Sequence, residues 1–411
     1  MRNAKIVRPE YADRFRCIGP TCEDSCCAGW VVDIDKATYE KYQSISSGPL
    51  RVLMDTHVVP RSEDPGDGKD PAALARIKLL PSGECPFHNA ERLCQIQVEL
   101  GEEYLSHTCA TYPRRSHVID KLVDKTLTTS CPEACRLVLL NPDLLESDWT
   151  GVRHVKWDDS KSDLTLVSHF WPVREFVIDL ITNRAYPLWQ RMFLLGTFSR
   201  RLEATVRGEI KGGFPAMLEG FSAAVASGGL RASIETIPAD LTLQLGMVLE
   251  LVKLGSRQSP RLVECIDAFG RGIEYGPEST LQSMSAAYGV AYERYFAPFF
   301  AEHPYILENY LINMVFNRLF PFGGKLLQGA AMPEPAKEFA LLATDFALVK
   351  GLLIGVAGAY KEDFSTQHVV LTVQSASKCF EHNSEFLPRV HQILVDKGIA
   401  NAHGLTMLIR N

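Results

Sequence analysis

The chain has 411 residues, of which 46% are hydrophobic and 22% charged, and its formal net charge is −6. This composition is typical of a soluble globular protein of two or three domains. No run of Lys or Arg stands out, which argues against a nucleic-acid partner. The N-terminus lacks the apolar core of a secretory signal. The most apolar window, 339–360, contains Asp345 and Lys350 and predicts a buried helix with no membrane partner. We therefore expect a cytoplasmic protein.

Nine of the eleven cysteines lie in the first third of the chain. Four of them fall within eleven residues of an irregular loop that contains Gly19 and Pro20: Cys17, Cys22, Cys26 and Cys27. Neighbouring cysteines such as Cys26 and Cys27 can hardly bridge each other without strain, and structural disulfides are rare in the cytoplasm. The pattern favours a thiolate metal site, either an iron–sulfur cluster or zinc. A disulfide scaffold and reduced core cysteines are the alternatives.

The elements that follow the first loop are short. Residues 31–34 predict a strand, and Asp35 is placed to cap a helix that begins near Lys36. The polar run 62–71 predicts an exposed loop. Cys85 and Cys94 flank a turn at 89–92, and a helix is expected over 94–107, where Cys109 ends it. Residues 118–129 predict a hairpin.

Cys131 precedes a proline, and proline is favoured at the first position of a helix. Cys131 is therefore expected at the N-cap, where the helix dipole favours a thiolate. Cys135 lies one turn later and is either a spare ligand or a buried structural thiol. The isolated Cys265 and Cys379 are expected in the core. His88 and His107 lie close to cysteines, but a lone histidine is more often a satisfied polar residue than a ligand.

Helical periodicity dominates from about residue 155. Helices are expected at 164–184, 188–207, 240–254, 280–298, 335–348 and 384–397, punctuated by Gly and Pro clusters at 212–215, 321–324 and 330–335. An apolar core stripe is expected on one helix, formed by Leu307, Tyr310, Leu311, Met314 and Val315. Glu308 and Asn309 are expected on a polar face of this helix, which is solvated or, as the alternative, functional. The predicted fold is mainly α: an irregular cysteine-rich α+β metal domain over 1–150, then an all-α helical domain over 151–411.

Common cofactor and catalytic motifs are absent from the sequence. It contains no G-x-x-x-x-G-K-[ST], H-E-x-x-H or G-x-S-x-G motif, and no strand–turn–helix of a doubly wound methyltransferase. Gly351, Gly355 and Gly358 fit helix packing better than a dinucleotide turn. Eight clustered thiols exceed the four that one zinc ion or one cubane needs. Either two metal centres exist or some of these thiols are structural.

Several motifs together resemble the flagellin lysine-N-methylase family. They are Cys17-x4-Cys22-x3-Cys26-Cys27-x2-Trp30, then Cys85-Pro86-Phe87 and Cys94, then Leu105 to Arg114, then Ser130 to Glu133, with a looser likeness at 306–311. The resemblance implies methyl transfer from S-adenosylmethionine to lysines of flagellin or another lysine-rich protein. It also implies an iron–sulfur cluster, [4Fe–4S] with zinc as the alternative. The matching positions, all implied ligands, are Cys17, Cys22, Cys26, Cys27, Cys85, Cys94, Cys109 and Cys131. The spacing departs from the C-x3-C-x2-C of radical S-adenosylmethionine enzymes.

Methylation of lysine requires a deprotonated amine and an aligned donor. Tyr112 and Arg114 follow Cys109 closely and are candidates for proton handling and for carboxylate binding. A solvated surface pair is the alternative for Arg114 and Arg115. The rival function is a non-enzymatic zinc- or iron-binding module that recognises a partner protein. The sequence leaves the donor site and the acceptor lysines open.

Overall fold

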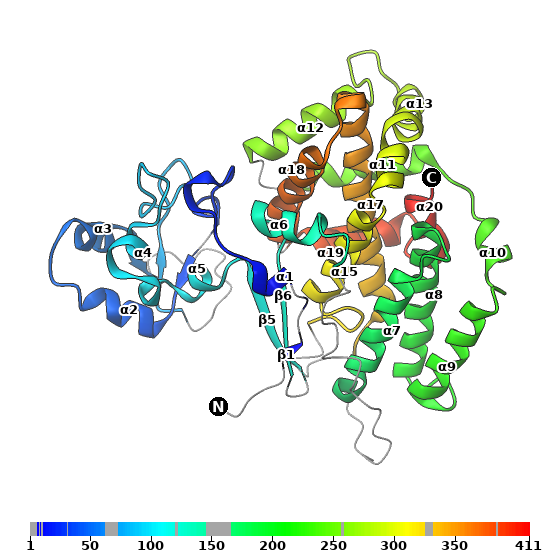
Figure 1. Cartoon of the computed structure of the whole chain (residues 1–411), viewed down its shortest axis with the longest axis horizontal. Coiled ribbons are helices and arrows are strands. Elements are labelled where there is room, and N and C mark those ends of the chain that lie inside the picture. The colour runs from blue at the N-terminus through cyan, green and yellow to red at the C-terminus, as the bar shows by residue number, and fades with distance from the viewer. Residues whose placement is uncertain are drawn as a thin grey trace. The chain divides into compact units, whose positions relative to one another are not determined.

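The computed structural model describes residues 6–7, 9, 11–30, 32–61, 73–119, 122–144, 166–255, 259–324, 332–383 and 385–411. The chain divides into two compact units (Figure 1). The cysteine-rich unit comprises Arg16–Arg115 and Cys131–Glu133, and the helical unit comprises Met1–Phe15, Ser116–Ser130 and Ala134–Asn411. The domain boundary predicted at residue 150 and the loop predicted at 62–71 lie outside the described residues and stay predictions.

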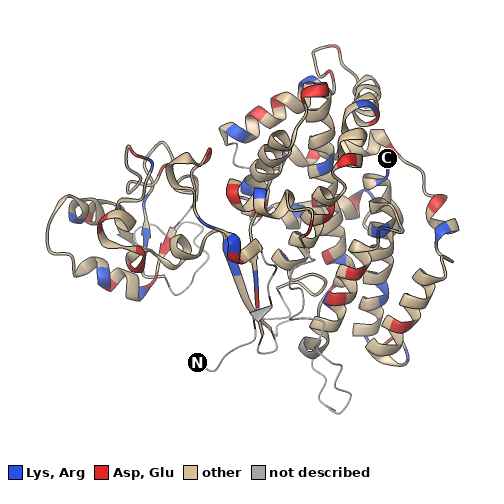
Figure 2. Cartoon of the chain, viewed as in Figure 1, with Lys and Arg blue, Asp and Glu red and all other residues tan. Residues whose placement is uncertain are grey.

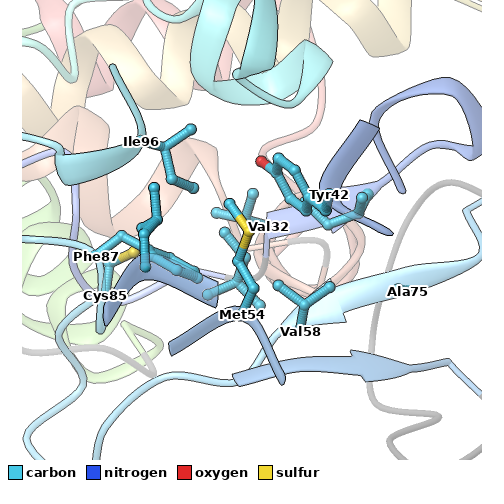
Figure 3. Close-up of a cluster of buried hydrophobic side chains, with 11 residues drawn as sticks. Val32, Tyr42, Met54, Val58, Ala75, Cys85, Phe87 and Ile96 are labelled. Carbon is cyan, nitrogen blue, oxygen red and sulfur yellow. The ribbon is translucent and has the colours of Figure 1, made fainter. Parts of the chain in front are cut away.

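A three-stranded antiparallel sheet in the order β2-β4-β3 forms the base of the cysteine-rich unit. Its strands are β2 (Val32–Ile34), β4 (Ala75–Ile77) and β3 (Val58–Pro60), and Ile77 pairs with Val32 on one side and Val58 on the other. Helices α2 (Lys36–Gln43), α3 (Pro49–His57), α4 (Gln95–Leu100) and α5 (His107–Thr111) complete the unit. The buried side chains of its core come from both sheet and helices (Figure 3).

Local sequence signals explain where the helices of this unit begin and end. Asp35 accepts a hydrogen bond from the N–H of Thr38 at 3.0 Å, so it caps α2 as predicted. The single helix expected over 94–107 was wrong. Gly101 has φ 97° and ends α4, a 3-10 turn (Glu102–Tyr104) follows, and α5 begins at His107. A positive φ suits glycine because it has no Cβ. Cys109 therefore lies inside a separate short helix and does not end a longer one.

The helical unit holds most of the remaining secondary structure. A small sheet in the order β1-β6-β5 joins β1 (Ile6–Val7), β6 (Leu122–Leu127) and β5 (Arg114–Ile119), and β1 runs parallel to β6. β5 starts in the cysteine-rich unit. The longer helices are α6 (Pro132–Leu139), α7 (Phe170–Thr182), α8 (Leu188–Val206), α9 (Gly213–Ala226), α11 (Leu241–Lys253), α12 (Pro260–Gly272), α13 (Leu281–Ala291), α15 (Tyr305–Asn317), α17 (Pro335–Tyr360), α18 (Thr366–Ala376), α19 (Phe386–Asp396) and α20 (Ala402–Ile409).

Shorter pieces connect these helices. They are α1 (Tyr11–Arg14), α10 (Arg231–Glu235), α14 (Ala297–Glu302), the 3-10 turns Leu166–His169 and Lys361–Asp363, and the π-helical turns Tyr292–Phe296 and Ser377–Glu381. No strand occurs among the described residues after position 144. The fold class predicted from the sequence, mainly α with an α+β cysteine-rich part, is therefore confirmed. Basic and acidic residues are interspersed along the helices of this unit (Figure 2).

α17 is the central helix of the helical unit and contacts α8, α11, α12, α13, α18, α19 and α20. A Cβ on Gly358 would lie 2.7 Å from the Cβ of Ala291 and 2.8 Å from the carbonyl oxygen of Gly272, so the predicted helix-packing role of this glycine is confirmed. Among the described residues, Pro335–Asp363 is the one helical stretch long and apolar enough to cross a membrane, and its apolar window is entirely buried within the fold. Core helices of this kind pass the same length and composition test.

α15 is buried on every side, which corrects the solvated face expected for Glu308 and Asn309. The Glu308 carboxylate is 4% exposed and pairs with Arg184 at 2.9 Å and with Arg191 at 2.6 Å. The Nδ2 of Asn309 donates to the carbonyl oxygens of Leu139 and Asn141. These two polar side chains are tolerated in the core because residues far along the chain satisfy their hydrogen-bonding groups.

Candidate metal centre

Backbone hydrogen bonds bring the segment of Cys27 against the segment of Cys85. The N–H of Cys85 donates to the carbonyl oxygen of Cys27 at 2.8 Å, and the N–H of Gly29 donates to that of Gly83 at 2.9 Å. Between them, Ala28 and Glu84 form a β-bridge. Two cysteines 58 positions apart therefore lie side by side, each held by main-chain pairing.

The turn that precedes α4 brings Cys94 next to the segment of Cys85. It forms a β-bridge with His88, and the N–H of Gln95 donates to the carbonyl oxygen of Phe87 at 2.8 Å. Burial raises the pKa of the Cys94 thiol above its ordinary value, while the N–H groups of Gln97 and Ile96 at the start of α4 act in the opposite direction. Cys94 therefore occupies a helix N-cap, a position where a thiolate is favoured.

Cys109 comes from α5, whose N-cap is Ser106. The Ser106 hydroxyl accepts a hydrogen bond from the N–H of Cys109 at 3.2 Å. Cys109 reaches solvent, yet desolvation by the surrounding chain, followed by the charges of Cys94, Cys85 and Cys26, raises the pKa of its thiol to about 12. The pKa of Cys109 therefore responds to three other thiols of the same unit.

The first cysteine loop is held by an arginine that the sequence reading did not single out. The Arg92 guanidinium donates to the carbonyl oxygen of Cys22 at 2.7 Å and to that of Pro20 at 3.3 Å. Arg92 itself has φ 61°, which projects its side chain from a tight turn. The 3-10 turn Gly19–Thr21 is thereby fixed next to the turn that leads to Cys94. A single arginine between two cysteines carries no sequence signal for this role.

Six thiols thus form a group, here termed the thiol cluster: Cys22, Cys26, Cys27, Cys85, Cys94 and Cys109. The pKa of Cys27 is raised by a hydrogen bond with Cys26, by burial and by the charges of Cys26, Cys85 and Cys94. Burial, opposed by the backbone at Phe87, raises the pKa of Cys85 to about 11. All eleven cysteines are free thiols. Within the described ranges, no group of three or more His, Cys, Asp or Glu side chains is arranged to hold a metal ion. The sulfurs are gathered but do not converge on one point.

The two remaining candidate ligands lie at the ends of the cysteine-rich unit. The Cys17 sulfur is exposed and accepts a hydrogen bond from the N–H of Gly19 at 3.4 Å. Cys131 is buried and directly precedes Pro132 at the start of α6, as the proline predicted. It groups with the cysteine-rich unit although 15 residues of the helical unit separate it from Arg115. Cys265 and Cys379 are buried in the helical unit, as expected of core thiols. Cys135 is buried there too, which favours the structural thiol over the spare ligand.

Tyr112 and Arg114 occupy different environments. Tyr112 follows α5, and its ring meets that of Trp30 edge to face, with centroids 4.6 Å apart. Arg114 is exposed at the first position of β5. A tyrosine that the sequence did not indicate, Tyr42, is 1% exposed, and burial together with the charges of Cys109, Cys94 and Cys85 raises its pKa. His88 is half-buried and His107 exposed at the start of α5.

The fold and the site define a class: a mainly α protein whose first unit gathers free thiols on irregular loops. Comparison with known families makes this specific. Residues 174–408, more than half of the chain, match the FliB lysine N-methylase C-terminal domain. The chain belongs to the FliB lysine N-methylase family, in agreement with the resemblance seen in its cysteine motifs.

Individual relatives match over a shorter stretch. Over 148 residues, 35% of this chain, the identity is 33% to the lysine-N-methylase of Salmonella typhimurium and 32% to that of Salmonella choleraesuis. Each match spans 35% of the length of those two enzymes. The flagellar biosynthetic protein FliU of Salmonella muenchen is 32% identical over 148 residues, which is 83% of its length. No solved structure matches the chain.

Proposed function

We propose that this protein transfers the methyl group of S-adenosylmethionine to lysine side chains of a protein, with flagellin as the acceptor. Membership of the FliB lysine N-methylase family is the observation that carries the proposal. The names of the relatives, lysine-N-methylase and flagellar biosynthetic protein, support the reaction and a flagellar acceptor respectively. In the reaction the lysine nitrogen lone pair forms a bond to the methyl carbon, the carbon–sulfur bond breaks, S-adenosylhomocysteine leaves, and the nitrogen gives up a proton.

The donor set of the thiol cluster fits an iron–sulfur cluster. Thiolates are the protein ligands of such clusters, and all six thiols are free. Burial raises the pKa of most of them, namely Cys22, Cys85, Cys94 and Cys109, and a hydrogen bond with Cys26 followed by burial raises that of Cys27. Forming the thiolates in the metal-free protein is therefore costly. A bound cation would offset this cost. We propose that four of the six hold a [4Fe–4S] cluster, with zinc as the alternative metal. When bound, an open iron site supplies a Lewis acid able to orient the amino and carboxylate groups of the donor.

The side chains around the thiols supply the remaining requirements. Tyr112 lies three residues after Cys109 and is partly buried against Trp30, so its side chain, in the phenolate form, is proposed to accept the proton that the lysine amine loses. Exposed Arg114, two residues on, is proposed to bind a carboxylate through its guanidinium fork. The aromatic rings of Trp30 and Tyr112 would also exclude water from the lysine side chain.

Metal analysis of the full chain, purified without oxygen, tests the metal part of the proposal. Iron with matching acid-labile sulfide and a broad visible absorption is expected. Cys26→Ser with Cys27→Ser should abolish both. The matched control, Cys265→Ser with Cys379→Ser, removes two buried thiols outside the cluster and should retain them. Stoichiometric zinc without sulfide would overturn the iron–sulfur proposal and favour the non-enzymatic binding module.

A methylation assay tests the reaction itself. Flagellin is incubated with the loaded protein and S-adenosylmethionine, and mass spectrometry counts additions of one methyl group per site. Tyr112→Phe keeps the ring but removes the hydroxyl, so a loss of about 10²–10⁴-fold in rate is expected if that hydroxyl handles the proton. Absence of methylation by the loaded wild-type protein on flagellin and on other lysine-rich proteins would overturn the proposed function.

A further inference from the structure

A groove in the helical unit shares no residue with the thiol cluster and belongs to no part of the proposed function. It is a cavity of about 550 Å³ between α8, the segment after α10 and the start of α20. A smaller hollow of about 260 Å³ shares Arg200, Asn401 and Ala402 with it and extends toward α17. We term the two together the α8–α20 groove. A cavity of this size is typical of a small-molecule site.

One face of α8 lines the groove. Phe193, Thr197, Arg200, Arg201 and Ala204 contribute to it, and their spacing of three or four residues places them along one side of a helix. The opposite side of α8 is buried in the core. The groove is therefore built on one side of a helix whose other side is packed in the core.

The permanent charges along the groove are of one sign. Arg200 and Arg201 line it together with His403, and no Asp or Glu of the described residues does. Within the described residues, neither Arg200 nor Arg201 has a carboxylate partner. Their neighbours on α8 differ in this respect, since Arg207 pairs with Glu203 and Arg191 pairs with Glu308. Arg200 and Arg201 thus place two adjacent positive charges, with no ion-pair partner in the described part of the chain, on a protein of net charge −6.

The walls and one end of the groove add to this pattern. Phe193, Ile210 and Ile237 provide an apolar surface beside the arginines. The groove ends at Ala402 and His403, the first residues of α20, whose N–H groups have no acceptor within the helix. Asn401 already caps the N–H of Gly404 at 3.0 Å. A ligand with an anionic group and an apolar body would match both parts of the lining.

We propose that the α8–α20 groove binds a small organic anion, with a carboxylate or phosphate group held by Arg200 and Arg201 and an apolar body against Phe193. Planar guanidinium forks suit both anionic groups. S-adenosylmethionine does not fit this site. It carries net positive charge, and no carboxylate in the lining is available for its ribose hydroxyls. The inference is therefore independent of methyl transfer.

Fluorescence titration of the full chain with 1-anilinonaphthalene-8-sulfonate, a sulfonate with an apolar body, tests the proposal. Arg200→Gln with Arg201→Gln should weaken binding of the probe at least about tenfold. Arg271→Gln with Arg294→Gln is the matched control. These arginines also have no carboxylate partner in the described part of the chain, but they do not line the groove, so binding should change less than about twofold.

Two further arms identify the ligand chemistry and guard against misfolding. Phenyl phosphate and phenylacetate share an apolar ring, so the one that displaces the probe better assigns a phosphate ester or a carboxylate. Ala204→Glu keeps both arginines but places a carboxylate at helical spacing from them, and it should abolish binding, whereas Ala223→Glu at an exposed position of α9 should not. Equal probe affinity in all variants, displacement by neither anion, or stronger displacement by S-adenosylmethionine would overturn the proposal.

Discussion

The ring of Trp30 packs edge to face against the ring of Tyr112, with an interplanar angle of 90°. Trp30 lies three residues after Cys27, and Tyr112 lies three residues after Cys109. The contact therefore joins the first cysteine loop to α5, 82 positions further along the chain. It gives both aromatic residues a structural role next to the thiol cluster, separate from any role of the Tyr112 hydroxyl in the reaction.

This contact predicts a measurable coupling between the two residues. Edge-to-face pairs contribute about 0.5–1.5 kcal/mol beyond their buried area. The losses in free energy of unfolding caused by Trp30→Leu and by Tyr112→Leu should therefore differ in sum from the loss caused by the double variant by that amount. Urea denaturation followed by circular dichroism measures all three losses. Tyr112→Phe keeps the ring and should preserve the coupling. Additive single effects would show that the two rings do not stabilise each other.

The two hydrogen bonds from Arg92 should hold the first cysteine loop in place. Arg92→Gly removes both hydrogen bonds to the loop, and glycine tolerates the backbone φ of 61° better than any other residue. We expect Cys22 in the metal-free protein to be alkylated several-fold faster, because the loop opens more often. Glu91→Gly makes a comparable change one position earlier, where the exposed side chain has no hydrogen bond or ion pair with any described residue, and should leave the rate close to that of the wild type. Mass spectrometry of the labelled Cys22 peptide measures both rates.

Signals that act over a few residues were read correctly from the sequence. Asp35 caps α2, Pro132 starts α6, and the periodic segment at 188–207 forms α8. Each depends on contacts within one or two turns, which the local sequence contains. The helix expected over 94–107 failed because Gly101 lies within that span, and its φ of 97° ends α4.

The remaining features depend on partners that the local sequence does not contain. Glu308 lies in the core because Arg191, 117 positions earlier, pairs with it, and a glutamate in a helix otherwise reads as solvated. Helix α9 begins at Gly213, inside a Gly and Pro cluster that was read as a break. In the thiol cluster the cysteine spacing marked the ligand candidates, but the pairing of Cys27 with Cys85 depends on backbone hydrogen bonds that no spacing encodes.

Asp124 and Arg174 form a fully buried ion pair, 3.3 Å apart, whose loss should be costly. Burial lowers the pKa of Arg174 and raises that of Asp124, with each partner opposing the effect on the other. Asp124→Ala leaves the guanidinium buried without its counterion, so we expect a loss of about 3–5 kcal/mol in the free energy of unfolding. Urea denaturation of the full chain, followed by circular dichroism, measures this loss.

Removal of both charges should be far less damaging than removal of one. Asp124 Oδ1 and Arg174 Nη2 are buried without a hydrogen-bond partner among the described residues, so the pair does not recover its full desolvation cost. The free energy of unfolding of the double variant Asp124→Leu with Arg174→Met should therefore lie within about 1 kcal/mol of the wild-type value. A double variant as unstable as Asp124→Ala would instead mean that the hydrogen bond from Arg174 to the carbonyl oxygen of Phe320 provides most of the stability.

Lys350 is buried inside the helical unit, and its titration should make the free energy of unfolding of the protein depend on pH. The ammonium group is buried, donates to the carbonyl oxygen of Ile409 at 2.7 Å and to the side chain of Asn411, and lies 5.5 Å from the ring centre of Tyr292. Burial lowers the pKa of Lys350 to about 7. In the unfolded chain the pKa of lysine is about 10.4.

Between these two pKa values the unfolded chain holds the Lys350 proton more tightly than the folded protein does. The free energy of unfolding should therefore rise with pH from about 7 toward 10, by up to about 1.4 kcal/mol per pH unit, and the full cost of burying the charge applies below pH 7. Lys350→Met removes this titration and leaves all others in place. The stability difference, wild type minus Lys350→Met, measured by urea denaturation at pH 6.5, 7.5, 8.5 and 9.5, should grow more positive at each step above 7. A constant difference would show that Lys350 keeps an ordinary pKa because its hydrogen bonds to Ile409 and Asn411 compensate for its burial.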